Sequence, residues 1–195
     1  SADYGTHVIT VSGATATYGN YNITQNNGTL TVNQRPITLT ATDQSKTYGD
    51  VDTLGTTAFS LTSGTYAPSE EATDVVLTTG ASAYESTATA NAGTYSGAID
   101  ISGATGTGGF LESNYNIDYR DGDYTVQKAA LTIAADNKSK TYGATEPVLT
   151  ATYTGFKNDE DPSVLADLVF SAPTGSSADV GSHAISPSGA TAANY

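Results

Sequence analysis

The stretch that decides the fold is Ile37-Thr38-Leu39-Thr40-Ala41, followed after three residues by Ser45-Lys46-Thr47-Tyr48-Gly49. Apolar and hydroxyl-bearing side chains alternate in the first segment, as in a β-strand with one dry face and one wet face. The second segment ends in a tyrosine and a glycine, and glycine permits a turn whose backbone is closed to other residues. Both segments return 94 residues later, as residues 131–135 and Ser139-Lys140-Thr141-Tyr142-Gly143.

Other motifs share this spacing. Asn20-Tyr21-Asn22-Ile23 recurs as Asn114-Tyr115-Asn116-Ile117, and residues 28–32 recur as residues 122–126. One spacing carried by several separate motifs indicates a tandem array. The array divides into three parts: residues 1–34 are the end of a first repeat, residues 35–128 are a complete repeat, and residues 129–195 are the front of a third.

Both ends of the sequence fall inside repeats, since Tyr195 corresponds to Tyr21 and Tyr115. We expect a piece cut from a longer array. The alternative is a natural unit whose ends complement neighbouring copies by strand donation. Direct joining of the two ends would duplicate a strand, because residues 2–21 and 178–195 play the same part, and this favours the first interpretation.

The local patterns predict six or seven strands per repeat and no helix longer than a turn. The expected strands are residues 5–9, 37–41, 57–62, 75–77, 93–101, 131–135, 149–154, 168–170 and 181–185, with one short helical turn at Asp161-Pro162. Asn-Gly at 27–28 and Asp-Gly at 121–122 predict a closing hairpin in each repeat.

The predicted fold class is therefore all-β. A repeat of this length suits a small immunoglobulin-like β-sandwich, with a β-grasp-like unit as the alternative. Only Asn33-Gln34-Arg35-Pro36 separates the first two repeats, and Gln127-Lys128-Ala129-Ala130 separates the next two. Joints this short cannot act as flexible tethers, so we expect the sandwiches to form an extended rod.

Composition excludes several classes of function. The chain has no cysteine, so it has no disulfide, no thiolate metal site and no cysteine nucleophile. Methionine is also absent, and a chain without oxidisable sulfur suits an extracellular environment. The net charge of −13 disfavours nucleic acid and anionic membranes as partners. No apolar run is long enough to insert into a bilayer.

Acidic loops give the chain weak candidates for a calcium site. Asp159 and Asp161 lie in one loop, and Asp50 and Asp52 follow the tyrosine of the first corner. Calcium needs six to eight oxygen ligands, and neither the spacing of an EF-hand nor a calcium-binding nonapeptide repeat is present. Solvated acidic loops are the favoured interpretation, and we expect no cofactor.

Histidine and lysine carry little further chemistry. His7 and His183 occupy equivalent positions, whereas the middle repeat has Tyr95 there, so we expect a surface or strand-edge role. Lys46 and Lys140 lie in what resembles a turn, and exposure is favoured over an isopeptide cross-link. No serine elbow, carboxylate-lined cleft or phosphate-binding glycine loop indicates an enzyme.

The run from Arg35 to Ala41, the segment Ser45–Asp50, the Asn114–Ile117 motif and the Gly-x-x-Thr-Val closing strand resemble the MBG repeats of the YGX type. That resemblance covers essentially the whole chain. It implies an exported protein of the bacterial cell surface, such as a filamentous-haemagglutinin-like adhesin, and it transfers no catalytic residue. The repeat motif residues are Tyr48, Gly49, Tyr142, Gly143, Asn20, Tyr21, Asn114 and Tyr115.

The favoured function is a non-catalytic stalk or spacer in an extracellular adhesin, fibre or biofilm protein. Its expected partners are neighbouring repeats of the same chain, like subunits in a fibre, and surface glycans or host ligands bound through other domains. Two alternatives stay open. One is a carbohydrate-binding module that uses Tyr66 and Tyr84, and the other is a filament subunit in which residues 22–34 complete a neighbouring copy.

Overall fold

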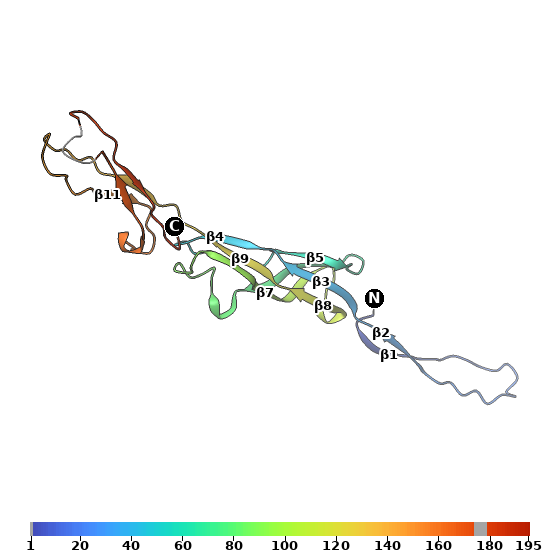
Figure 1. The fold of residues 1–195 in the computed structure, drawn as a ribbon. Coiled ribbons are helices and arrows are strands. Elements are labelled where there is room, and N and C mark those ends of the chain that lie inside the picture. Colours follow the sequence, from blue (N-terminus) through green and yellow to red (C-terminus); the bar gives the residue numbers. More distant parts are fainter. Residues whose placement is uncertain (1, 174–178) are drawn as a thin grey trace. The chain divides into compact units, whose positions relative to one another are not determined.

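The computed structural model describes residues 2–173 and 179–195, and this part of the chain is all-β (Figure 1). The strands are β1 Gly5–Ile9, β2 Gly28–Val32, β3 Arg35–Ala41, β4 Gln44–Thr47, β5 Phe59–Gly64, β6 Glu71–Thr78, β7 Gly93–Thr107, β8 Tyr115–Arg120, β9 Gly122–Gln127, β10 Thr132–Ala135, β11 Ala151–Thr154, β12 Val169–Ser171 and β13 Ser186–Ser188. Helical structure in the described ranges consists of the short 3-10 turns η1 Gly80–Ser82, η2 Glu112–Asn114 and η3 Pro162–Val164. None of the described helices has the length and apolarity that crossing a bilayer requires.

Two compact units divide the chain. The first comprises Ser1–Thr42, Gly55–Thr78 and Ile99–Gly122, and the second comprises Asp43–Leu54, Thr79–Ala98 and Asp123–Tyr195. The middle repeat contributes segments to both units. The predicted repeat boundaries follow sequence similarity rather than compactness, and they stay a prediction.

In the first unit, β3 is the centre of a three-stranded sheet with the order β5-β3-β8. It pairs antiparallel with β5 and parallel with β8, and Figure 1 shows β3 and β8 side by side. The alternation expected for residues 37–41 is confirmed, because Ile37, Leu39 and Ala41 are buried and the threonines between them are not. Two further antiparallel pairs, β1 with β2 and β6 with residues 99–107 of β7, complete this unit.

In the second unit, β9 lies between β4 and the first part of β7. Its pairing with β4 is parallel, and β10 pairs with β11 and β12 with β13 in antiparallel ladders. Tyr124 and Val126 of β9 are fully buried, so the period of two in Gly122–Gln127 turns one face of this strand into core.

The predicted closing hairpin is wrong. The expected turn at Asp121-Gly122 is absent, since Asp121 is a single residue without a turn between β8 and β9, and β8 pairs in parallel with β3 whereas β9 pairs in parallel with β4. In the first repeat, β2 pairs with β1, and residues 21–27 form no strand. Asp-Gly is only a local preference for a hairpin turn, and the parallel pairing of β8 with β3 and of β9 with β4 overrides it.

Two other expectations also need correction. Residues 181–185 form no strand, and the pairing there begins only at β13. Lys46 is buried rather than exposed, since its Nζ donates hydrogen bonds to the carbonyl oxygens of Thr87 at 2.7 Å and Glu85 at 3.4 Å. Burial lowers the pKa of this ammonium, and the charges of Glu85, Asp52 and Asp50 oppose that shift.

Tyr124 and Tyr119 provide a matched test of buried hydroxyl groups. Burial raises the pKa of each to about 12. The Tyr124 hydroxyl has no hydrogen-bond partner within the described ranges, whereas the Tyr119 hydroxyl accepts from the Ala104 N–H at 2.9 Å and donates to Glu112 at 2.6 Å. Removal of the phenolic oxygen should therefore be neutral or stabilising at Tyr124 and destabilising at Tyr119.

We predict that Tyr124→Phe leaves the free energy of unfolding unchanged or raises it, because a buried hydroxyl without a partner is removed. Tyr119→Phe should lower it by about 1–3 kcal/mol, because two hydrogen bonds are lost. Urea unfolding midpoints measured at neutral pH check both values. A Tyr124→Phe variant as destabilised as Tyr119→Phe would show that the Tyr124 hydroxyl is paired.

Candidate functional site at the joints between repeats

The second joint is built around Tyr48. Because β4 pairs in parallel with β9, Thr47 lies opposite Gln127, and the Tyr48 N–H donates to the Gln127 carbonyl at 2.8 Å. Gln127 is the residue at which the chain leaves the middle repeat. The parallel register therefore places the corner tyrosine where the next repeat begins.

Glu160 of the third repeat receives this tyrosine. The Tyr48 hydroxyl donates to Glu160 Oε1 at 2.6 Å, and the Tyr195 hydroxyl donates to Glu160 Oε2. The two rings meet edge to face, with centroids 5.7 Å apart and planes at 80°. One carboxylate thus joins a tyrosine of the middle repeat to a tyrosine of the third. The partner of the Tyr48 hydroxyl is therefore a side chain of the next repeat.

Tyr195 is held from both sides. Its hydroxyl accepts the Lys157 N–H at 2.7 Å while it donates to Glu160. Burial raises the pKa of Tyr195, and the hydrogen bond to Glu160 raises it further, because an ionised phenol could not donate to a carboxylate. The joint therefore requires the neutral form of this tyrosine.

The turn beside Tyr48 fits closely against the third repeat. Gly49 has a φ of +89°, and a β-carbon built there would lie 2.5 Å from Cβ of Lys157. Lys157 Nζ also forms an ion pair with Asp50 at 3.1 Å, and Asn158 Nδ2 donates to the Ala88 carbonyl at 3.2 Å. The ion pair is exposed and contributes little, so the close packing at glycine matters more.

The first joint repeats part of this arrangement in the first unit. The Tyr115 hydroxyl donates to Glu70 Oε2 at 2.6 Å and accepts the Ala67 N–H at 3.0 Å. The ring of Tyr66 meets Tyr115 edge to face at 6.2 Å, as Phe156 meets Tyr195 at 5.6 Å. The pairing of Arg35 with Tyr115 in the parallel ladder places this tyrosine where the chain enters the middle repeat.

The asparagine before each of these tyrosines reaches back to the preceding repeat. Asn114 Oδ1 accepts the Tyr4 N–H at 2.8 Å, and Asn194 Oδ1 accepts the Ala92 N–H at 2.9 Å. The side-chain amide nitrogen of Asn114 donates to Oδ1 of Asp3, the residue before Tyr4. That of Asn194 donates to Oδ1 of Asn91, the residue before Ala92. The Asn-Tyr motif is therefore a contact between repeats at both joints.

Side chains of the linkers also donate hydrogen bonds across the joints. Gln34 Nε2 donates to the Ser113 carbonyl at 3.1 Å. Lys128, at the equivalent position, donates through Nζ to the carbonyl oxygens of Ala192 at 2.8 Å and Tyr195 at 2.9 Å. Each linker side chain thus binds the Asn-Tyr segment of the repeat that follows it.

The other copies of the predicted motifs lie elsewhere. Tyr142 is 63% exposed, although Tyr48 in the identical pentapeptide is only 3% exposed. Gly143 keeps a positive φ of +80°. Asn20 and Tyr21 are exposed in a segment without strand pairing. The structure therefore brings Tyr48, Gly49, Asn114 and Tyr115 into joints and leaves the remaining four motif residues outside them.

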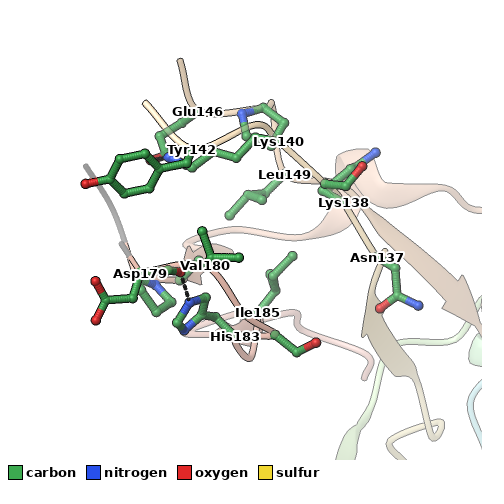
Figure 2. Close-up of a pocket in the computed structure, with 16 residues that line it drawn as sticks. Asn137, Lys138, Lys140, Tyr142, Glu146, Leu149, Asp179, Val180, His183 and Ile185 are labelled. Atoms are coloured by element: carbon green, nitrogen blue, oxygen red, sulfur yellow. Dashed lines mark hydrogen bonds and ion pairs between the residues drawn. The ribbon is translucent and has the colours of Figure 1, made fainter. Parts of the chain in front are cut away.

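Tyr142 lies beside an open cavity of about 600 Å³ in the third repeat (Figure 2). Figure 2 shows Lys140, Tyr142 and Glu146 on one side of it and Asp179 and His183 on the other. Lys140 and Glu146 form an ion pair at 2.5 Å. His183 donates to the backbone carbonyl of Asp179, and no described arrangement in the cavity resembles a nucleophile with its base.

The histidines have a structural role in this arrangement. Nε2 of His7 donates to the carbonyl oxygen four residues earlier at 2.8 Å, and Nε2 of His183 does the same at 2.9 Å (Figure 2). The Tyr95 hydroxyl of the middle repeat donates to the equivalent carbonyl at 2.7 Å. Each of the three repeats therefore has a side-chain hydrogen bond that closes the same loop, and the donor is histidine in two repeats and tyrosine in one.

The calcium candidates are dispersed. Asp161 accepts the Ser163 N–H at 2.8 Å at the start of η3, and hydrogen bonding to Ser163 lowers its pKa. Asp52 accepts the Thr53 N–H, Asp50 pairs with Lys157, and Asp159 stands in the turn with a φ of +58°. In the part of the chain that the structure describes, no three acidic or histidine side chains gather as metal ligands. The expectation of solvated acidic loops without a cofactor stays a prediction.

The sequence patterns do not single out Glu70 and Glu160, although both lie at the joints. A signal for them was present, because each follows an aromatic residue by four positions, in Tyr66-Ala67-Pro68-Ser69-Glu70 and Phe156-Lys157-Asn158-Asp159-Glu160. The surrounding acidic residues concealed it, since one repeated carboxylate is hard to distinguish from a solvated acidic loop.

Comparison with known families gives one match. The sequence model described as MBG domain (YGX type) matches residues 37–125 and 131–195. No curated protein matches the chain with significant similarity, and neither does any solved structure. The two matched segments place the same motif residues in the same order, with the Tyr48 and Tyr142 corners near the start of each.

Replacement of Gly49 tests the close fit of the joint. Gly49→Ala should lower the free energy of unfolding by about 2–4 kcal/mol, because it combines a strained positive φ with overlap against Lys157. Gly143→Ala is the matched control. It carries the same strain but has no atom within 4 Å of the new methyl group, so it should cost only about 1–2 kcal/mol. Equal losses in thermal or urea unfolding would contradict the observed packing.

The contribution of Tyr195 should depend on pH. Its pKa is raised in the folded protein from the ordinary 10.0, so its stabilising effect is complete below about pH 10 and is lost as the pH rises through the raised value. At neutral pH, Tyr195→Phe should lower the free energy of unfolding by about 1–3 kcal/mol. This difference from the unmodified chain should shrink under alkaline conditions. Tyr21→Phe alters an exposed ring and should show no difference at either pH.

Proposed function

The chain belongs to the MBG domain family of the YGX type, and on this premise we propose that it is a non-catalytic spacer segment of a bacterial adhesin or extracellular fibre. Domains of this family are repeat domains of large bacterial surface proteins. The segment would act outside the cell, at the cell surface, and would hold a binding region at a distance from it. Its immediate partners would be the neighbouring repeats.

The observation that carries this proposal is the joint around Glu160. A spacer must resist bending where its repeats meet, and a joint of four linker residues is restrained best by side-chain contacts across it. Tyr48, Glu160 and Tyr195 provide such a contact with hydroxyl-to-carboxylate hydrogen bonds, which are stronger than neutral ones. The Asn-Tyr contacts are made at both joints, as expected of an array that keeps one arrangement from repeat to repeat.

The carbohydrate-binding alternative has less support. Tyr66 packs edge to face against Phe110 and Tyr115, and Tyr84 stacks on Tyr95 with ring centroids 3.9 Å apart. Sugar-binding tyrosines present open ring faces to solvent, and these two rings are already paired within the protein. The net charge of −13 also disfavours the binding of acidic glycans, because it would repel them.

The test is to display the 195-residue chain on a cell surface between an anchor and a terminal epitope, and to measure the height of the epitope. A Gly/Ser linker of equal residue number is the control, because its mean end-to-end distance is only roughly 80 Å. The spacer function predicts a greater height for the chain, and a reduced height for Gly49→Ala. Equal heights would contradict it, and saturable binding of a neutral glycan by the purified chain would favour the carbohydrate-binding alternative.

A further inference from the structure

The first and last strands of the middle repeat are paired in parallel. β3 opens the repeat and pairs with β8, and β4 pairs with β9, which closes it. Both ladders have the same register, since Arg35 faces Tyr115 where they begin and Thr47 faces Gln127 where they end. The chain therefore enters the repeat at the amino-terminal end of the β3 ladder and leaves it at the carboxy-terminal end of the β9 ladder.

The connections between these strands are short and held in place. Two residues separate β3 from β4, and one residue separates β8 from β9. The Asp123 N–H donates to Asp43 Oδ1 at 2.8 Å, and a β-carbon on Gly122 would lie 2.9 Å from the Ala41 carbonyl oxygen. Connections of this length cannot extend far, so tension on one strand passes directly to the next.

Tension along an array of repeats would load both ladders in shear. The preceding repeat pulls β3 at Arg35, and the following repeat pulls β9 at Gln127. In a parallel pair, these two pulls draw the strands past each other along their length. All the backbone hydrogen bonds of a ladder then bear the load together, whereas an antiparallel pair pulled at its open end would separate one hydrogen bond at a time.

Further hydrogen bonds oppose this sliding where the load leaves the repeat. The Tyr48 N–H donates to the Gln127 carbonyl and lengthens the β4–β9 ladder by one bond. On β4, the buried ammonium of Lys46 donates to the carbonyl oxygens of Thr87 and Glu85. Movement of β4 along β9 would separate this ammonium from both acceptors, and a buried charge without hydrogen bonds is costly.

We propose that the middle repeat is a load-bearing module, in which the β3–β8 and β4–β9 ladders resist tension along the array. Mechanical strength is a property beyond spacing, because a spacer can hold a binding region at a distance without bearing a load. Forced unfolding depends on the rate of crossing a barrier, so this strength is distinct from equilibrium stability. Its use at the cell surface rests on the proposed spacer function, whereas the strength itself follows from the register of the ladders.

The test compares two directions of pulling on the whole chain by single-molecule force spectroscopy. The chain has no cysteine, so a pair of introduced cysteines gives unique attachment points. Asn33→Cys with Ala130→Cys pulls the ladders in shear. Asn33→Cys with Ser113→Cys pulls β3 and β8 apart at the end where both begin. All three positions are exposed, so the core is unchanged in both variants.

At equal pulling speed, the rupture force should be severalfold higher in the shear geometry, because the hydrogen bonds of a ladder share the load. Equal rupture forces in the two geometries would overturn the proposal. This measurement is independent of the spacer function, since a low epitope height in the display experiment would leave the two rupture forces unchanged.

A pair of core variants tests whether the ladders carry the load. Val126 of β9 and Val75 of β6 are each 2% exposed. Alanine at either position removes the same buried side chain and should lower the urea unfolding midpoint to a similar degree. Only Val126→Ala should lower the rupture force in the shear geometry, since Val75 lies outside both ladders. Equal reductions of the rupture force would overturn the assignment of the load to these ladders.

Discussion

The joint between the middle and third repeats depends on a carboxylate whose hydrogen-bond donors are neutral hydroxyl groups. Glu160 lies between two tyrosine hydroxyls, and each hydroxyl comes from a different repeat. The half-buried Glu160 carboxylate loses part of its hydration, and hydrogen bonds from the two phenols replace it without adding a positive charge. The chain has 20 acidic and only 7 basic residues, and this contact stabilises a carboxylate without using a lysine or an arginine.

Parallel strand pairing brings these groups together. An antiparallel hairpin would return the chain to its starting point, whereas a parallel pair places two residues far apart in the sequence at the same end of a ladder. The register of β3 with β8 sets Tyr115 beside the entry of the middle repeat, and that of β4 with β9 sets Tyr48 beside its exit. The contacts at the joints are thus a consequence of pairing inside a repeat.

The sequence predicted the all-β class, the repeat period and most strand positions, because these depend on local alternation and on glycine at turns. It could not predict which strands pair. Asp121-Gly122 resembles a hairpin turn in isolation, and only tertiary competition sends β8 and β9 to different partners. Nor could it separate Tyr48 from Tyr142, since identical pentapeptides differ in exposure according to what another part of the chain brings against them. The buried Lys46 is a similar case, since the carbonyls that accept its hydrogen bonds lie about 40 residues further along the chain.

Interchange of histidine and tyrosine at positions 7, 95 and 183 shows that the repeats preserve a hydrogen bond rather than a residue type. The joints follow the same logic, since glutamine and lysine exchange at positions 34 and 128. Every such contact uses residues at equivalent places in the repeats. Duplication or loss of one whole repeat by recombination would therefore recreate a complete set of joint contacts. The length of the array can then change in a single genetic event without a new interface having to evolve.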